Sequence, residues 1–364
     1  MPRPKKGRLN MNVTLTHQFP PTGGNPRNSE GAFLRGKQGE ILFAYSCYHG
    51  DSNHDHAACD IALTVSWDEG KSWSEPRLIA RAEELGVENI MSVSALEQKN
   101  GDLAFYFLIK ERDLTTTIGR TVSANGVDFR TERCRADFPP YYYVINNDRL
   151  VRLRNGRILA PAAYITGEDC RADRRVPYVT TLLISDDDGE SFYKADFDYT
   201  TTDPLNMRYG LQEPGVLEYP DGSLYLWMRT NYYCQYECES DGDVNVFTQP
   251  HASQFTSPPS PMQVKEFDGA LYAIYNPTPR YNGRVSAEGT WDRTPFVIRK
   301  STDGGKTYGP LNMIEDDPTR GYCYPAVFQT NDGHLLLAYC RGDAVDGNTL
   351  CRLGIARAEI ASIE

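Results

Sequence analysis

The chain has 364 residues, of which 40% are hydrophobic and 24% are charged, and its formal net charge is −11 at pH 7. This acidic balance argues against a surface for nucleic acid or anionic membranes, because both need a basic footprint. No apolar run reaches the roughly 18 residues of a membrane-spanning helix.

The nine cysteines are irregularly spaced and include no paired Cys-x-x-Cys array, which favours reduced thiols in a cytoplasmic protein over a disulfide framework or a zinc site. Residues 1–10 are basic and are not followed by an apolar run, so we expect a flexible segment rather than an export signal. Residues 11–17 alternate apolar and polar side chains, which predicts a strand.

A glycine followed by an alternating apolar strand recurs along the chain. The copies begin at Gly39, Gly101, Gly156, Gly222, Gly269 and Gly333. They lie between 47 residues (Gly222 to Gly269) and 66 residues (Gly156 to Gly222) apart, about the length of one four-stranded propeller blade with its loops. The repeat predicts an all-β, six-bladed β-propeller that spans residues 1–364 as one domain, with residues 11–17 completing the last blade.

A second repeat has the pattern Ser-x-Asp-x-Gly-x-Ser/Thr-aromatic, with good copies beginning at Ser66, Ser185 and Ser301. In this turn the aspartate accepts from nearby backbone N–H groups, the glycine takes a positive φ and the aromatic ring packs under the hairpin. If the first repeat joins strands 1 and 2 of each blade and the second joins strands 3 and 4, both turns lie at one end. Functional side chains are then expected at the other end, around the axis.

Charged residues occupy that end in blades one and four. Arg27 begins the first strand of blade one and faces the polar loop of residues 49–56, which contains Asp55. In blade four the hairpin turns near Asp221, which places Glu213 opposite Arg229.

Blades five and six add further candidates at the same end. Arg293 opens the strand that leads to the Ser301 turn, and Tyr322 begins the first strand of blade six. Tyr324 is a rival to Tyr322, because residues two apart on a strand point to the same side. The hairpin register favours Tyr322.

These turns and side chains resemble the Asp-box (BNR) repeats and active site of the sialidase (neuraminidase) superfamily. The resemblance implies an exo-acting glycoside hydrolase that removes a terminal acidic sugar with retention, without a metal or other cofactor. It assigns the substrate carboxylate to Arg27, Arg229 and Arg293, the nucleophile to Tyr322, its base to Glu213 and the acid/base to Asp55. Guanidinium groups suit the first role because they pair bidentately with a carboxylate. A tyrosine suits the second, because a carboxylate nucleophile would be repelled by the sugar acid.

One segment departs from the family pattern. The first family arginine is usually followed by Ile-Pro, whereas Arg27 is followed by Asn28, Ser29 and Glu30. A carboxylate so close to the arginine fits either a salt bridge or a different substrate. The sequence therefore also fits a propeller glycosidase or lyase that acts on another acidic sugar.

Each candidate also has a structural interpretation. The arginines fit salt bridges between blades, and Asp55 fits a solvated loop. The tyrosines at 141–143 and 232–233 fit sugar stacking and blade packing equally well. Cys323 fits a small buried residue better than a nucleophile, since no histidine is adjacent. A carbohydrate-binding propeller without activity is the alternative from a different functional class.

Overall fold

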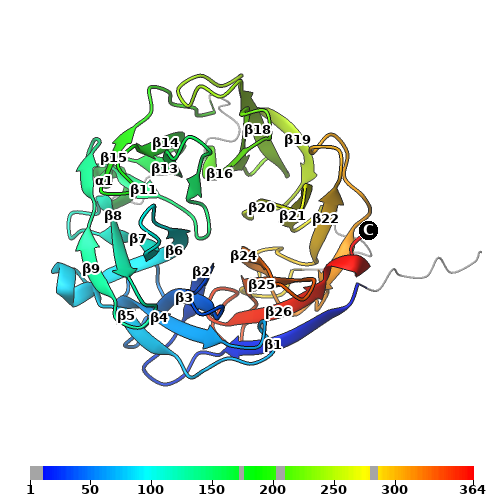
Figure 1. Ribbon diagram of the computed structural model, residues 1–364, viewed down its shortest axis with the longest axis horizontal. Coiled ribbons are helices and arrows are strands. Elements are labelled where there is room, and N and C mark those ends of the chain that lie inside the picture. The colour runs from blue at the N-terminus through cyan, green and yellow to red at the C-terminus, as the bar shows by residue number, and fades with distance from the viewer. Residues whose placement is uncertain (1–10, 172–175, 202–209, 279–285) are drawn as a thin grey trace, which may run out of the picture.

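The computed structural model describes residues 11–171, 176–201, 210–278 and 286–364. The predicted flexible segment 1–10 lies outside these residues. Figure 1 shows the sheets arranged as a ring, with β2, β6, β16, β20 and β24 nearest its centre. This is the propeller-like all-β arrangement that the glycine repeat predicts. Within the described residues, no helix is both long and apolar enough to cross a membrane.

The described strands form five hydrogen-bonded sheets. An eight-stranded sheet contains β2 (Asn28–Arg35), β3 (Ile41–Tyr48), β4 (Cys59–Ser66), β5 (Arg77–Ala80), β6 (Asn89–Glu97), β7 (Leu103–Lys110), β8 (Thr116–Ser123) and β9 (Arg130–Arg133). A six-stranded sheet contains β10 (Arg135–Asp137), β11 (Tyr142–Val144), β12 (Val151–Arg152), β13 (Ile158–Ile165), β14 (Val179–Ser185) and β15 (Ser191–Lys194).

The other three sheets have four strands each. The first contains β16 (Gln212–Glu218), β17 (Leu224–Arg229), β18 (Cys234–Ser240) and β19 (His251–Thr256). The second contains β20 (Gln263–Phe267), β21 (Ala270–Tyr275), β22 (Phe296–Ser301) and β23 (Asn312–Glu315). The third contains β24 (Cys323–Gln329), β25 (His334–Cys340), β26 (Leu353–Glu359) and β1 (Val13–Phe19). The described residues also form the short helices η1 (Ala82–Leu85), α1 (Gly167–Arg171) and η3 (Ile360–Ser362).

The ring is closed by β1, which pairs antiparallel with β26 from Val13 opposite Ala358 to Phe19 opposite Leu353. The prediction that the N-terminal stretch completes the last sheet is confirmed. The apolar core lies between neighbouring sheets, as where Phe33 and Phe43 pack with Leu336 and Ile355. Closure therefore buries apolar surface between the two ends of the chain.

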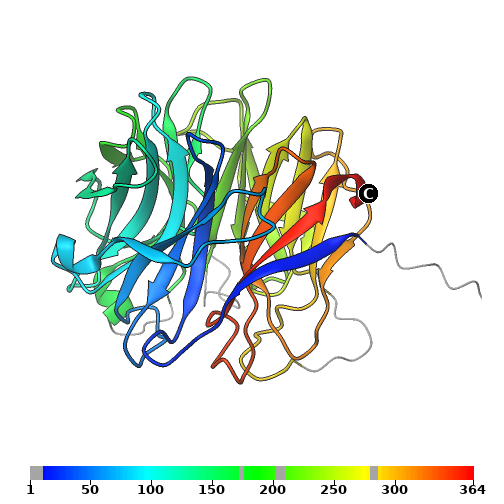
Figure 2. The same cartoon turned by 60° about the horizontal axis from the view of Figure 1, so that its bottom comes forward.

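Strand register separates two ends of the ring, which Figure 2 shows with the strands running between them. Ile41 pairs with Ser66, so the turns at Gly39 and Ser66 lie at one end of β3 and β4, and Tyr48 pairs with Cys59 at the other end. The Ser66 turn closes as predicted: Ser66 Oγ accepts from the Gly70 N–H at 2.8 Å, and Asp68 Oδ1 accepts from the Ser72 N–H at 2.8 Å.

Four of the inner strands contain a bulge near the opposite end. The register shifts within β2, β6, β16 and β24. At each shift one residue has a left-handed backbone, and these are Glu30 (φ 55°), Ser92 (φ 62°), Glu213 (φ 45°) and Tyr324 (φ 55°). Such a conformation is strained for a residue with a side chain, and this kind of strain concentrates at functional sites.

Candidate functional site

A cavity of about 610 Å³ opens at the bulged end of the inner strands. Its charged and polar walls include Asp55, Glu213, Arg229, Arg293 and Tyr324. Its aromatic walls are Tyr142, Tyr178, Tyr233 and Trp291. Five of the predicted site residues, if the rival Tyr324 is counted, thus face one space.

A tyrosine and a glutamate meet in the wall of this cavity. The Tyr324 hydroxyl donates to Glu213 Oε1 at 2.9 Å, and Arg229 Nη1 pairs with Glu213 Oε2 at 2.7 Å. Burial acts to raise the pKa of Glu213, but the charge and hydrogen bond of Arg229, with Arg293 and the Tyr324 hydroxyl, lower it overall. Glu213 is therefore a carboxylate at neutral pH, and it is poised to accept the tyrosine proton.

Tyr322 does not take part in this contact. Its side chain is fully buried in the core cluster that contains Phe296 and Tyr339, with both ring centroids 6.2 Å from its own. The prediction that Tyr322 faces Glu213 is wrong, and the rival Tyr324 holds that place. The reason is the bulge in β24, where the register shifts between Cys323 and Ala326 and Tyr324 has a left-handed backbone.

Arg293 lies beside this pair. It is 5% exposed and its guanidinium lies over the rings of Trp291 and Tyr324, at 5.1 Å and 5.6 Å from their centroids. Its Nη1 donates to Cys323 Sγ at 3.0 Å. With Arg229, it supplies the cavity with two guanidinium groups.

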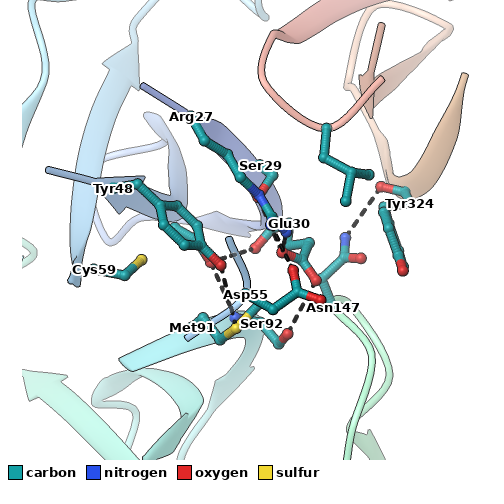
Figure 3. Close-up of polar contacts among 12 residues, drawn as sticks. Arg27, Ser29, Glu30, Tyr48, Asp55, Cys59, Met91, Ser92, Asn147 and Tyr324 are labelled. Carbon is teal, nitrogen blue, oxygen red and sulfur yellow. Dashed lines mark hydrogen bonds and ion pairs between the residues drawn. The ribbon is translucent and has the colours of Figure 1, made fainter. Parts of the chain in front are cut away.

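Arg27 is close to the site but is not among the described residues that line the cavity. It is 2% exposed, and Figure 3 shows its guanidinium between two carboxylates. Nη2 pairs with Glu30 at 2.8 Å, Nη1 pairs with Asp55 at 2.5 Å, and Nε donates to Ser29 Oγ at 3.0 Å. The prediction that three arginines converge on one ligand carboxylate is wrong for Arg27, because each of its nitrogens is already engaged.

Asp55 connects this ion cluster with the cavity. Its side chain is 55% exposed, and the Lys110 ammonium donates to its backbone carbonyl at 2.5 Å. Partial desolvation at the cavity wall acts to raise the pKa of Asp55, but the charges of Arg27 and Lys110 hold it well below its usual range. The pKa of Glu30 is raised, because its burial outweighs the charge of Arg27.

Lys110, Trp291 and Tyr178 were not identified from the sequence. Lys110 ends β7 as a buried charge, and burial lowers the pKa of its ammonium although Asp55 and Glu30 oppose this. A lysine at the end of an otherwise apolar second strand was the available signal, since that end faces the site. Tyr178 lies directly before β14 and Trp291 lies a few residues before β22, and the repeat gives no register for either segment.

Comparisons with known proteins identify the sequence family and the fold. The sequence family described as a BNR repeat-like domain matches residues 39–337. No curated protein sequence matches the chain.

Solved structures share the fold at low identity. The Hadza microbial sialidase Hz136 is 14% identical with a TM-score of 0.71, over 93% of this chain and 66% of that one. The NanB sialidase from Streptococcus pneumoniae is 12% identical with a TM-score of 0.67, over 97% and 71%. The intramolecular trans-sialidase from Ruminococcus gnavus, in complex with oseltamivir carboxylate, is 13% identical with a TM-score of 0.67, over 97% and 98%.

Proposed function

Because the chain belongs to the BNR repeat-like domain family, we propose that it is an exo-acting glycoside hydrolase of sialidase type, which removes a terminal acidic sugar with retention. The observation that carries the proposal is the 2.9 Å hydrogen bond from the Tyr324 hydroxyl to Glu213 in the wall of a cavity with two arginines. A binding module needs arginines and aromatic rings, but it has no use for a tyrosine in the cavity wall paired with a base.

In the proposed reaction the Tyr324 oxygen attacks the anomeric carbon as its proton passes to Glu213. The glycosidic carbon–oxygen bond breaks, and protonated Asp55 gives its proton to the leaving oxygen. Water then attacks the tyrosyl intermediate as Asp55 takes its proton, and the tyrosine leaves with the proton returned by Glu213. Two displacements at one carbon retain the configuration.

Arg229 and Arg293 hold the substrate carboxylate in this scheme. Each can present a planar pair of N–H groups, which fixes the acid more sharply than a lysine would. Arg27 has another task, because its pairing with Asp55 fixes the loop that carries the acid/base. The two carboxylates on Arg27 favour, as the second candidate, a glycosidase for an acidic sugar other than sialic acid.

We also propose that the ring has six blades. Within the eight-stranded sheet, β2 to β5 and β6 to β9 are two antiparallel units joined by one parallel bridge from Cys59 to Asn89. Counting these units separately gives one unit for each copy of the glycine repeat.

The test is a screen of terminal α-glycosides of sialic acids and of uronic acids, followed by two variants compared on the best substrate. Tyr324→Phe should lose most turnover, at least a hundredfold in kcat, while its affinity for the product acid stays near that of the wild type. Tyr322→Phe is the matched control, since Tyr322 is buried in the core and should keep near wild-type kcat in the folded fraction. Near-normal turnover by Tyr324→Phe, or no release from either class of glycoside, would reject the proposal.

A further inference from the structure

Arg293 is a buried cation with an unusual partner. Within the described residues it forms no ion pair with a carboxylate, and its acceptors are Cys323 Sγ at 3.0 Å and the Pro259 carbonyl at 3.4 Å. Its Nε has no acceptor there. A buried guanidinium normally requires a counter-ion, because removing a charge from water is costly.

Cys323 is placed to be that counter-ion. It is fully buried at the start of β24, next to Tyr324 in sequence and directly opposite Cys340 of β25. Burial acts to raise the pKa of the Cys323 thiol and Glu213 opposes ionisation, but a hydrogen bond from Cys340 and the charge and hydrogen bond of Arg293 lower it overall. In contrast to Cys323, seven other cysteines have a thiol pKa that burial raises. They are Cys47, Cys59, Cys134, Cys234, Cys238, Cys340 and Cys351.

We propose that Cys323 is a positioning residue whose thiolate is the buried counter-ion of Arg293 and aims its guanidinium into the cavity for a ligand carboxylate. This role follows from the geometry of the acceptor. A carboxylate in the same place would bind the guanidinium bidentately and compete with the ligand. Cys323 Sγ engages one N–H of Nη1 and the Pro259 carbonyl one N–H of Nη2, so each terminal nitrogen keeps one N–H for an acid. The identity of the ligand as a carboxylate rests on the proposed function, but the ionisation of Cys323 does not.

The ionisation is measured by the ultraviolet absorbance of thiolate during a pH titration of the folded protein. The wild type should contain about one thiolate well below the ordinary cysteine pKa of about 8.5. Cys323→Ser should lose that signal. Cys134→Ser is the matched control and should keep it, because burial raises the pKa of Cys134 to about 12. Superimposable titrations of the wild type and Cys323→Ser would overturn the proposal.

Arg293→Gln tests the same pairing from the other partner. Removing an opposite charge at hydrogen-bond distance should raise the Cys323 midpoint by about 1 to 3 pH units, and Arg293→Lys should restore part of the difference. An unchanged midpoint in Arg293→Gln would overturn the proposal even if Cys323→Ser failed to fold. Circular dichroism of each variant identifies such a failure.

A kinetic measurement then separates positioning from a merely structural role. On the substrate found by the screen, Cys323→Ala should raise KM several-fold while kcat falls less, since the nucleophile and its base are untouched. A fall in kcat as large as the rise in KM would reject the positioning role. If the screen finds no substrate, the proposed function fails while the titrations still decide whether Cys323 is the thiolate partner of Arg293.

Discussion

At the scale of the residue, the charge state of Asp55 sets the expected pH dependence. Asp55 must be protonated to donate, yet Arg27 and Lys110 lower its pKa, and Glu213 must be ionised, which its own lowered pKa allows. We therefore expect kcat/KM to fall as pH rises through neutrality, by about tenfold per pH unit while only the loss of protonated Asp55 matters.

The variant Lys110→Met should extend activity to higher pH. Removing one of the two cations raises the pKa of Asp55, so the falling limb of the kcat/KM profile should move to higher pH. The measurement is the full pH profile, with Lys71→Met as control because Lys71 pairs with Asp332 on the surface. A limb that stays in place in Lys110→Met would show that this cation does not govern the proton donor.

Single residues also show where prediction from sequence stops. Strand ends and hairpin pairing were enough to bring Asp55, Glu213, Arg229 and Arg293 to one cavity. The same register wrongly favoured Tyr322 over Tyr324, because one extra residue in β24 changes which side chain faces the axis and leaves no mark in the pattern. For Arg27 the sequence placed Asp55 and Glu30 nearby and left a salt bridge open, but it could not show that both carboxylates pair with the arginine at once.

At the scale of the element, the turns should tolerate substitution unequally. Gly189 and Gly222 both have a positive φ, of 85° and 90°. A methyl group added at Gly189 would overlap the Tyr106 hydroxyl. A methyl group added at Gly222 would have no neighbouring atom within 4 Å. Gly222→Ala should lose about 1 to 2 kcal/mol for the backbone alone. Gly189→Ala should lose about 1 to 3 kcal/mol more for the overlap.

The measurement is the free energy of unfolding in denaturant for each variant against the wild type. The difference between the two variants isolates the contact between the turn and Tyr106 in β7. Equal losses would mean that the turn moves away from Tyr106 without cost.

Elements were predicted well where the repeat is regular and poorly where it is not. The glycine repeat locates β3, β7, β13, β17, β21 and β25, each of which begins within two residues of its glycine. The six-stranded sheet differs from a simple meander, because β11 and β12 both pair with β13 and β10 runs parallel to β15. Parallel pairing across a loop has no local sequence pattern, so the sequence could not have predicted it.

At the scale of the whole molecule, stability should depend on the contact that closes the ring. Phe19 of β1 is 5% exposed and its ring lies 4.6 Å from that of Tyr45 in the next sheet. Phe19→Ala should cost about 3 to 5 kcal/mol. Thr14→Ala on the exposed face of the same strand should stay within about 0.5 kcal/mol of the wild type. Thermal unfolding of both variants is the measurement, and a small loss for Phe19→Ala would show that closure contributes little.

The pairing of β1 with β26 also sets an order of events during synthesis. The Thr16 hydroxyl donates to the Ile355 carbonyl 339 positions away, so β1 leaves the ribosome long before the strand that it must join. Until then the nascent chain carries a strand without its partner at one side of an unfinished ring, and unpaired strands invite association with other chains. Slow translation should therefore lengthen the interval of risk, and a circular permutant that begins after β1 would make β26 and β1 in succession.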